Sequence, residues 1–331
     1  LKRDMLLAML VALYVDDLLL VYKNEEDVDK LIAALRNRWG DITIGDGTSF
    51  CGLSITDVDD KVYVSQTGFQ KTVGDTIDIE KDIEKYYKKS WREAPWGSEG
   101  YPTLSQSTVD FTDITRYQCA IGLLLWCCQT RYDLMPMVGL LASCQVNPKE
   151  DDWVRVVRLL WYVRKTYQVG LIFKPIERIN GKIVLTASVD SSLQANRGHT
   201  GFSLALGFNA TPFLCSSKKQ KVVSKSSCEA EFYGYNEVCT VVMYVRQVLR
   251  YVYGMKDLPI TFIECDNSSA IEATHSECIT SNLGHAPVKA YYARQCFQMK
   301  EVIFIHTRTN KLLADSFTKC LSGWLFERNR R

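Results

Sequence analysis

The sequence has no excess of charge of either sign. Forty Lys and Arg residues stand against 38 Asp and Glu residues, which leaves a net charge of +2 over 331 residues. A global polycation is therefore excluded, and any binding to nucleic acid must depend on local basic patches. The chain also lacks internal repeats and low-complexity tracts. Because 47% of its residues are hydrophobic and 24% are charged, wholesale disorder is excluded as well.

Histidine is scarce, and the cysteines lack the spacing of a metal site. There are 4 His and 12 Cys residues, no C-x-x-C occurs, and Cys127 and Cys128 form the only close pair. This pattern gives no support to a zinc site. We expect reduced, mostly buried thiols in an intracellular protein, located in a cytoplasmic particle or the nucleus, with an organelle also open.

No apolar run is long enough to span a membrane. The run from Met5 to Val15 has 11 residues and ends at Asp16 and Asp17, whereas a bilayer needs about 20. A small-residue cleavage site is also missing, which argues against a signal peptide. We predict a strand, a turn and a second strand, and no membrane partner. Since a core-like strand begins almost at residue 1, we expect that sequence normally preceding it is absent.

Changes in composition divide the chain into three segments, 1–75, 76–178 and 179–331. The first reads as a hairpin, a helix from Glu25 to Trp39 and short strands near 52–53 and 62–65. The second has a surface helix near 78–89, a long connection at 91–110, and apolar helical stripes at 117–128 and 152–165. Asn180 and Gly181 mark a turn at the boundary, which we place near 176–181.

The third segment predicts a mixed sheet covered by helices. The predicted strands are 182–190, 201–207, 211–216, 260–265 and 302–307. The predicted helices are 226–252, 268–273 and 288–300. The first three strands follow one another at hairpin spacing, and helices separate the later ones. The fold class is therefore α+β or α/β.

Four acids of this segment stand where a ligand crevice is expected. Asp190 and Asp266 close the first and fourth strands, and Asp315 begins a helix after the fifth strand. Near the start of the long helix, Glu231 and Glu229 are both candidates for the fourth acid of the site. At 100° per residue their side chains point to nearly opposite faces of the helix. Glu231 shares the apolar, sheet-facing stripe of Tyr235, whereas Glu229 shares a stripe expected to be solvated. A buried carboxylate at position 231 therefore needs a partner.

A pair of divalent cations is one partner that would satisfy these acids. Mg²⁺ prefers oxygen ligands, and two such ions about 4 Å apart promote in-line attack on a phosphodiester. Spacing by itself leaves a second interpretation open. Asp190 and Asp266 then are turn residues at strand ends, Glu231 interacts with the helix dipole, and Asp315 is a helix cap.

A basic segment directly precedes the long helix. Residues 216–225 contain Lys218, Lys219, Lys221 and Lys225 and no acid. Lysines beside a carboxylate site suit a phosphate backbone that the acids would otherwise repel. A solvated turn is the other interpretation. Ser226 and Ser227 are candidates for the helix N-cap.

Two ordered sets of motifs run along the chain. The C-terminal set is Ser216-Ser-Lys-Lys-Gln-Lys, Ser226-Ser-Cys-Glu-Ala-Glu-Phe, Glu264-Cys-Asp-Asn-Ser-Ser-Ala-Ile and Leu313-Ala-Asp-Ser-Phe-Thr-Lys. The earlier set is Tyr14-Val-Asp-Asp, Phe50-Cys-Gly-Leu, Val64-Ser-Gln, Thr130-Arg-Tyr-Asp and Val146-Asn-Pro. Together they resemble the ribonuclease H and reverse transcriptase parts of the Pol polyprotein of copia-type (Pseudoviridae) LTR retrotransposons, over almost the entire chain. The resemblance implies a ribonuclease H-like mixed sheet with flanking helices, preceded by a partial palm hairpin (1–75) and a helical thumb and connection (76–178).

The resemblance also implies the site residues and their ligands. Asp190, Glu231, Asp266 and Asp315 would bind two Mg²⁺ (or Mn²⁺) ions, and the reaction would be hydrolysis of RNA in an RNA–DNA hybrid. Lys218, Lys219, Lys221 and Lys225 would contact the nucleic-acid backbone. His285 matches a histidine of the family, and in ribonucleases H a mobile histidine often assists product release; the other interpretation of His285 is a surface histidine near a helix cap. Asp16 and Asp17 would be remnants of a polymerase site.

Departures from the family pattern keep other functions open. Polymerisation needs a third carboxylate and fingers, so we expect no polymerase activity unless a partner chain supplies them. The residues around His285 differ from the family, Tyr132 replaces a proline, and the stretch after Asp190 is short. One alternative is a co-opted remnant that acts as a structural subunit of a large host complex. Another is non-catalytic binding of nucleic acid through the lysine segment.

Overall fold

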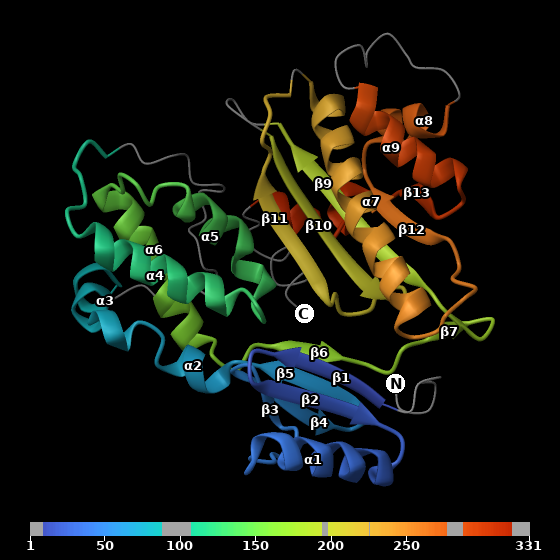
Figure 1. Ribbon diagram of the computed structural model, residues 1–331. Helices are drawn as coiled ribbons and strands as arrows, with labels where there is room; N and C mark the ends of the chain where they lie inside the picture. Colours follow the sequence, from blue (N-terminus) through green and yellow to red (C-terminus); the bar gives the residue numbers. More distant parts are fainter. Residues whose placement is uncertain (1–8, 88–106, 194–197, 225, 277–286, 320–331) are drawn as a thin grey trace.

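A computed structural model of the chain describes residues 9–87, 107–193, 198–224, 226–276 and 287–319. These residues form four sheets and a group of helices (Figure 1). His285 and Lys225 lie outside the described residues, as does most of the predicted connection at 91–110. Among the described residues, we find no helix with both the length and the hydropathy that crossing a bilayer requires.

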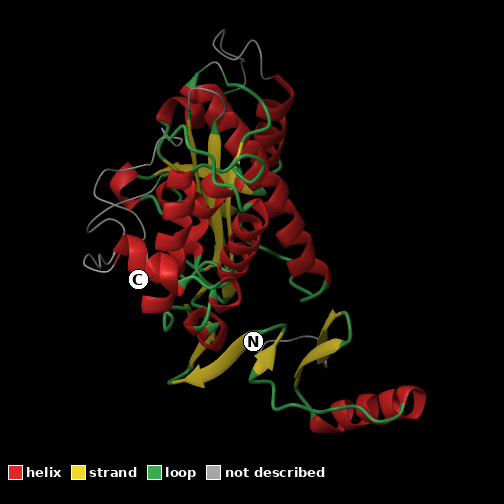
Figure 2. Cartoon of the chain, turned by 90° about the vertical axis from the view of Figure 1, so that its left-hand side faces the viewer, coloured by secondary structure: helices red, strands yellow, loops and turns green. Residues whose placement is uncertain are grey.

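The chain begins with the predicted hairpin and helix. Strands β1 (Met9–Tyr14) and β2 (Asp17–Tyr22) pair with each other, and α1 (Glu25–Trp39) follows. Figure 2 shows α1 at the far end of the molecule, away from the other helices. The expectation of a core-like first strand is wrong, because Leu13 and Val15 are 69% and 83% exposed and no described residue of either strand is buried. The two-stranded sheet has too few packing partners to cover this apolar run.

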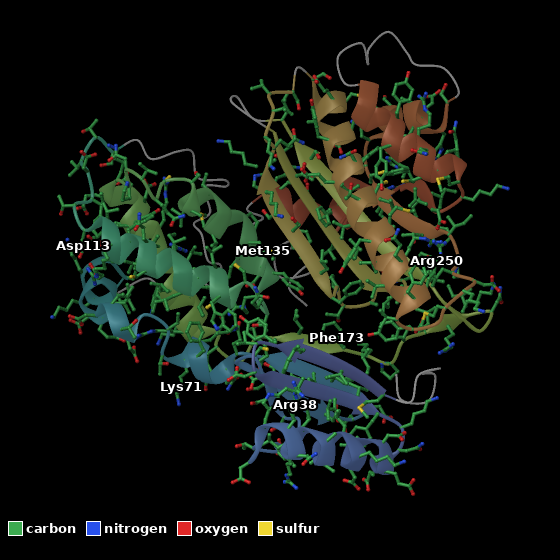
Figure 3. All side chains as sticks on the ribbon, in the orientation of Figure 1. Arg38, Lys71, Asp113, Met135, Phe173 and Arg250 are labelled. Carbon is green, nitrogen blue, oxygen red and sulfur yellow. The ribbon has the colours of Figure 1, made fainter. Side chains whose placement is uncertain are left out.

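A second small sheet joins distant parts of the chain. It has the order β3 (Ser49–Phe50), β4 (Leu53–Val58), β5 (Lys61–Ser65) and β6 (Leu171–Phe173). In β5, Val62 pairs with Phe173 of β6, which Figure 3 labels. Strand β6 of the second segment therefore pairs with a strand of the first segment. The segment boundary at residue 75 stays a prediction, and this pairing links the two segments on either side of it.

Between these strands lies a helical region with its own core. Its elements are α2 (Thr67–Lys71), η1 (Asp75–Ile77), α3 (Glu80–Tyr87), α4 (Ile114–Cys127), η2 (Tyr132–Leu134), α5 (Met135–Ala142) and α6 (Glu150–Lys165). The buried side chains of α4 and α6 recur at helical spacing, and Ile121 and Leu124 of α4 belong to the same core as Val156 and Leu160 of α6. The predicted helices at 117–128 and 152–165 are confirmed, with starts two or three residues earlier.

One ion pair is buried in the polar part of this region. The Arg131 guanidinium lies 2.8 Å from Asp133 Oδ2, and the two side chains are 0% and 7% exposed. Arg131 also donates to the Thr166 carbonyl oxygen at 3.2 Å, and its guanidinium stacks over the Tyr162 ring. The Tyr162 hydroxyl donates to Asp133 at 3.0 Å. This network connects the turn after α4 to α6.

The predicted mixed sheet forms after a short hairpin of β7 (Arg178–Ile179) and β8 (Lys182–Ile183). Its strands are β9 (Leu185–Ser192), β10 (His199–Leu206), β11 (Leu214–Lys219), β12 (Thr261–Cys265) and β13 (Val302–His306), in the spatial order β11-β10-β9-β12-β13. The first three strands pair antiparallel, and β9, β12 and β13 pair parallel. The fold class is confirmed.

Two strand predictions need correction. The strand expected at 182–190 is divided, because Lys182 and Ile183 pair with β7 rather than with β10. The third strand extends to Lys219 instead of ending at Ser216, and Lys219 pairs with His199. Polar residues such as Lys are common on an edge strand, which offers one open side to water, so a search for apolar alternation stops too early there.

Helices cover both faces of this sheet. The long helix α7 (Ser227–Tyr251), α8 (Ser268–His275) and α9 (Pro287–Gln298) lie over one face (Figure 1). The short α10 (Asp315–Thr318), which follows η4 (Thr309–Lys311), contacts β9 and β10 from the other face. Figure 3 labels Met135 in α5, the helix that packs against the edge strand β11. The helical region therefore closes one side of the sheet.

A buried histidine makes the stability of this sheet depend on pH. His199 is 5% exposed, its Nε2 lies 2.8 Å from Ser217 Oγ, and burial together with the nearby Lys219 lowers its pKa from 6.5 to about 4. Between pH 6.5 and 4 the unfolded chain binds more protons at this residue than the folded chain does, so stability falls as the pH is lowered. We expect His199 to contribute a loss of about 3 kcal/mol across that window. The check is urea unfolding of wild type and His199→Gln at pH 7 and 4.5. An equal loss in both proteins contradicts the expectation.

Candidate metal centre

Asp190 is held near the carboxyl end of the central strand β9. Side chains alternate along a strand, so Ser188 and Asp190 face α10 while Val189 and Ser191 face α7. The Ser188 hydroxyl accepts a hydrogen bond from the Ala314 backbone amide at 3.1 Å, and the Thr318 hydroxyl donates to Asp190 Oδ2. The strand and the short helix together fix the Asp190 carboxylate, which is 3% exposed.

Two glycines allow the helices to approach this strand closely. A Cβ atom at Gly234 of α7 would meet Ser191 Oγ and lie 3.2 Å from Val189 Cγ2. A Cβ atom at Gly201, the residue of β10 opposite Asp190, would lie 2.6 Å from Phe317 Cβ of α10. The distance at Gly201 is too short for any larger residue, so glycine is required there for α10 to pack against the sheet. At Gly234 a larger residue would force Ser191 and Val189 to move.

Glu231 projects from the first turns of α7 towards the strand end. Ser226 caps this helix by accepting a hydrogen bond from the Glu229 backbone amide at 3.1 Å, as predicted. Glu231 is 4% exposed and continues the buried stripe of Tyr235 and Val238. The expectation of a solvated Glu229 is wrong, because Glu229 is only 9% exposed. The segment before the helix folds back over the first turn, where Gln220 Nε2 donates to the Ala230 carbonyl oxygen.

Asp266 follows directly after β12, the strand parallel to β9. Its Oδ2 accepts a hydrogen bond from Thr309 Oγ1 of η4 at 2.7 Å. The turn after β13 therefore orients this carboxylate. Because β9 and β12 are parallel neighbours, Asp190 and Asp266 come to the same edge of the sheet.

The structure brings three of the four predicted acids together. Asp190, Glu231 and Asp266 each offer a carboxylate oxygen, and these three atoms lie within 4.8 Å of one another. Among the residues that the structure describes, this is the only group of three or more such side chains close enough to hold one metal ion. Asp315 lies outside this group. Asp16 and Asp17 stand at the tip of the β1–β2 hairpin and belong to no such group within the described residues.

A lysine connects Asp315 to the three acids. Lys319 Nζ forms an ion pair with Asp315 and lies 3.8 Å from Asp190 Oδ2. Burial works against its charge, but Asp190 and Asp315 raise the pKa of the Lys319 amine. One positive charge thus partly balances the acidic group in the structure.

The remaining negative charge is strongly disfavoured in the absence of a cation. Burial, followed by repulsion from Asp190 and Asp266, raises the pKa of Glu231 to about 9. Burial also raises the pKa of Asp190, although Lys319 and Thr318 oppose this effect. In addition, Glu231 Oε2 is buried without a hydrogen-bond partner. A buried carboxylate oxygen without a partner costs free energy, and a divalent cation with oxygen preference would remove that cost.

The residues present therefore fit a hard divalent ion. Asp190, Glu231 and Asp266 supply oxygen ligands of the kind that Mg²⁺ and Mn²⁺ bind, and the described residues within 4.8 Å offer no thiolate or imidazole to the group. Asp315, which is paired with Lys319, lies outside this ligand set.

The structure describes three of the four predicted lysines. Lys218 and Lys219 lie at the exposed end of the edge strand β11, and Lys221 is exposed in the turn that follows. Because β11 is antiparallel to β10, and β10 to β9, the lysine end of β11 lies at the same edge of the sheet as Asp190. The predicted roles of His285 and Lys225 lie outside the described residues.

Sequence reasoning missed three polar residues of the site: Thr309, Thr318 and Lys319. Thr318 and Lys319 belong to the motif quoted for the family resemblance, but no role was predicted for them. The spacing from Asp315 to Lys319 is i to i+4, which favours an ion pair on a helix and was the available signal. Thr309 gives no such signal, because its contact with Asp266 depends on the turn after β13.

The sheet order, the antiparallel and parallel pairings, and the helix that carries an acid to the end of the first strand define a ribonuclease H-like domain. No family model matches this sequence. Comparison with individual proteins does find relatives. The chain is 26% identical over 314 residues, 95% of its length, to the retrovirus-related Pol polyprotein from transposon RE2 of Arabidopsis thaliana. It is 24% identical over 328 residues, 96% of its length, to that from transposon TNT 1-94 of Nicotiana tabacum.

The relatives of this chain therefore include retrovirus-related Pol polyproteins from transposons, as the motifs predict. The matches cover 21% and 24% of the two relatives, so the chain spans less than a quarter of their length. A solved structure of a foamy viral protease–reverse transcriptase in complex with double-stranded DNA aligns with 90% of this chain and 46% of its own length. Its TM-score is 0.47 and its sequence identity is 10%.

Proposed function

We propose that this chain is a reverse transcriptase–ribonuclease H fragment that hydrolyses the RNA strand of RNA–DNA hybrids with divalent metal ions. The observation that carries the proposal is the group of three carboxylates within 4.8 Å, one of which has a buried oxygen without a partner. Homology to Pol polyproteins over 95% of the chain supports the same function. Buried acids without a ligand would be replaced at lower cost by apolar residues, so a purely structural role explains them less well.

The proposal assigns a task to each side chain. Asp190, Glu231 and Asp266 would hold one ion, and Asp315 with Asp190 would hold a second once Lys319 moves aside, while Thr318 and Thr309 orient the carboxylates of Asp190 and Asp266. The chemistry that such a pair of Mg²⁺ or Mn²⁺ ions would supply is activation of a water and stabilisation of the leaving oxygen in an in-line displacement. Lys218 and Lys219 bind phosphates of the hybrid on the β11 side.

A polymerase function finds less support in the described part of the chain. Asp16 and Asp17 lie in or beside a two-residue turn at the end of a hairpin, and no third acid among the described residues joins them. We therefore propose that they are remnants of a polymerase site, and we expect no nucleotide incorporation by this chain.

Metal removal tests the function directly. We expect the full chain to cleave a labelled RNA–DNA hybrid in Mg²⁺ or Mn²⁺, and to lose cleavage completely in EDTA. Metal should also raise the melting temperature, because an ion that binds only the folded state stabilises it. Matched RNA duplex and DNA duplex serve as controls for substrate class. A folded chain that cleaves no hybrid in either metal contradicts the enzyme proposal.

A further inference from the structure

Basic side chains lie on both sides of the acidic group at one edge of the sheet. The strand order β11-β10-β9-β12-β13 puts Asp190 on the central strand β9 and Asp266 directly after its neighbour β12, while Glu231 comes from α7. Strands β11 and β13 are the two outer strands. Lys218 and Lys219 end β11. Arg308 and Lys311 follow the end of β13.

Strand register shows that these ends point the same way. Ser217 of β11, Gly201 of β10 and Asp190 of β9 lie in one row, so Lys218 is one residue beyond the row of Asp190. On the other side, His306 of β13 pairs with Cys265, the residue before Asp266. Arg308 follows two residues later, at the same edge of the sheet.

The turn that carries Arg308 and Lys311 is fixed next to the acids. Thr309, between them, donates to Asp266 at 2.7 Å. The Leu312 backbone amide donates to the Arg308 carbonyl oxygen at 3.1 Å, and the Leu312 side chain is fully buried. Arg308 and Lys311 are exposed, and neither forms an ion pair within the described residues. Rigid placement of two unpaired cations beside a carboxylate group suits a ligand that carries several negative charges.

We propose that Arg308 and Lys311 form a second phosphate-binding position. The hybrid would then run across the ends of the strands, over the acids, from the side of the outer strand β11 to the side of the outer strand β13. This inference rests on the proposed function. Four strand spacings of about 4.8 Å separate the edges, roughly 19 Å. That distance corresponds to about five or six nucleotides at 3.4 Å each. The scissile phosphate then lies over the acids, and phosphates on either side of it are bound by cations.

The test is the salt dependence of hybrid binding. Binding of a labelled hybrid by the full chain is measured in Mg²⁺ between about 50 and 200 mM salt, in an Asp190→Asn background that prevents turnover. Two phosphate contacts contribute about 1.8 to the slope of log affinity against log salt. Over this range the parent should therefore lose about twelvefold more affinity than Arg308→Gln/Lys311→Gln does.

The chain offers a matched control at the opposite edge of the same sheet. Lys256 and Lys300 are exposed and precede β12 and β13, so Lys256→Gln/Lys300→Gln removes the same charge far from the acids. We expect this control to keep the parent slope. Equal slopes for the Arg308/Lys311 variant and this control overturn the inference. If Lys218→Gln/Lys219→Gln still lowers the slope in that case, the proposed function survives, whereas a chain that binds no hybrid at all overturns both.

Discussion

Asp190→Asn should abolish hydrolysis of the hybrid while leaving the fold intact. Asp190 lies on the central strand, belongs to the group of three acids and is 3% exposed. Loss of residues that only orient a metal ligand typically costs 10- to 100-fold in activity, so loss of the ligand itself should cost more than about a hundredfold. The measurement is the initial rate of cleavage of a labelled hybrid in Mg²⁺, with the circular dichroism spectrum as the check on folding.

The matched control is Asp257→Asn. Asp257 is an exposed acid before β12, at the opposite edge of the sheet from Asp190. It undergoes the same chemical change without touching the proposed metal centre, so the rate should stay at the wild-type value. If Asp190→Asn cleaves as fast as Asp257→Asn, the three acids are not the catalytic group. The buried Glu231 Oε2 without a hydrogen-bond partner would then need another explanation.

Removal of a negative charge from this group should also stabilise the metal-free fold. Repulsion from Asp190 is one cause of the raised pKa of Glu231, after burial. Asn at position 190 therefore makes ionisation of Glu231 easier and weakens metal binding at the same time. Loss of activity together with a melting temperature that no longer responds to Mg²⁺ would separate a metal-site effect from unfolding.

The sequence predicted the part of the site that depends on strand order and helical periodicity. Asp190 and Asp266 follow strongly apolar strands, and their meeting is a consequence of parallel neighbours. Glu231 was distinguished from Glu229 by angular position, and only Glu231 joins the acidic group among the described residues. The same argument failed for the burial of Glu229, because a helical wheel contains no information about chain segments that fold over the first turn.

Contacts between distant segments were beyond sequence reasoning. The pairing of β6 with β5 joins residues more than a hundred positions apart, and β6 has only three residues, too few for a periodic signal. Thr309 reaches Asp266 through a turn whose geometry no motif specifies. The hairpin of Leu13 and Leu18 was read as core because apolar composition indicates burial only where other elements are present to cover it.

The largest expected loss of stability comes from Asp133→Ala. Asp133 is the carboxylate partner of the fully buried Arg131 guanidinium, at 2.8 Å. Removing one member of a buried ion pair leaves the other charge without compensation and typically costs about 3–5 kcal/mol. Urea unfolding, followed by tryptophan fluorescence to which Trp153 of the same core contributes, should show a clearly lower midpoint than wild type. In the exposed pair of Lys81 and Asp78, the control Lys81→Ala should cost less than about 1 kcal/mol.

A double variant separates the value of the pair from the cost of a single unpaired charge. If burial of the guanidinium is the cause, Arg131→Met combined with Asp133→Leu should be more stable than Asp133→Ala, because no buried charge remains. The Tyr162 hydroxyl then loses its acceptor, which limits the recovery. A double variant as unstable as the single one would mean that the network acts through geometry, by fixing the turn after α4 on α6.

The same turn begins η2 and α5, and α5 packs against β11 and α10, the helix that begins with Asp315. Loss of that geometry should therefore weaken metal binding as well, whereas a purely electrostatic cost should not.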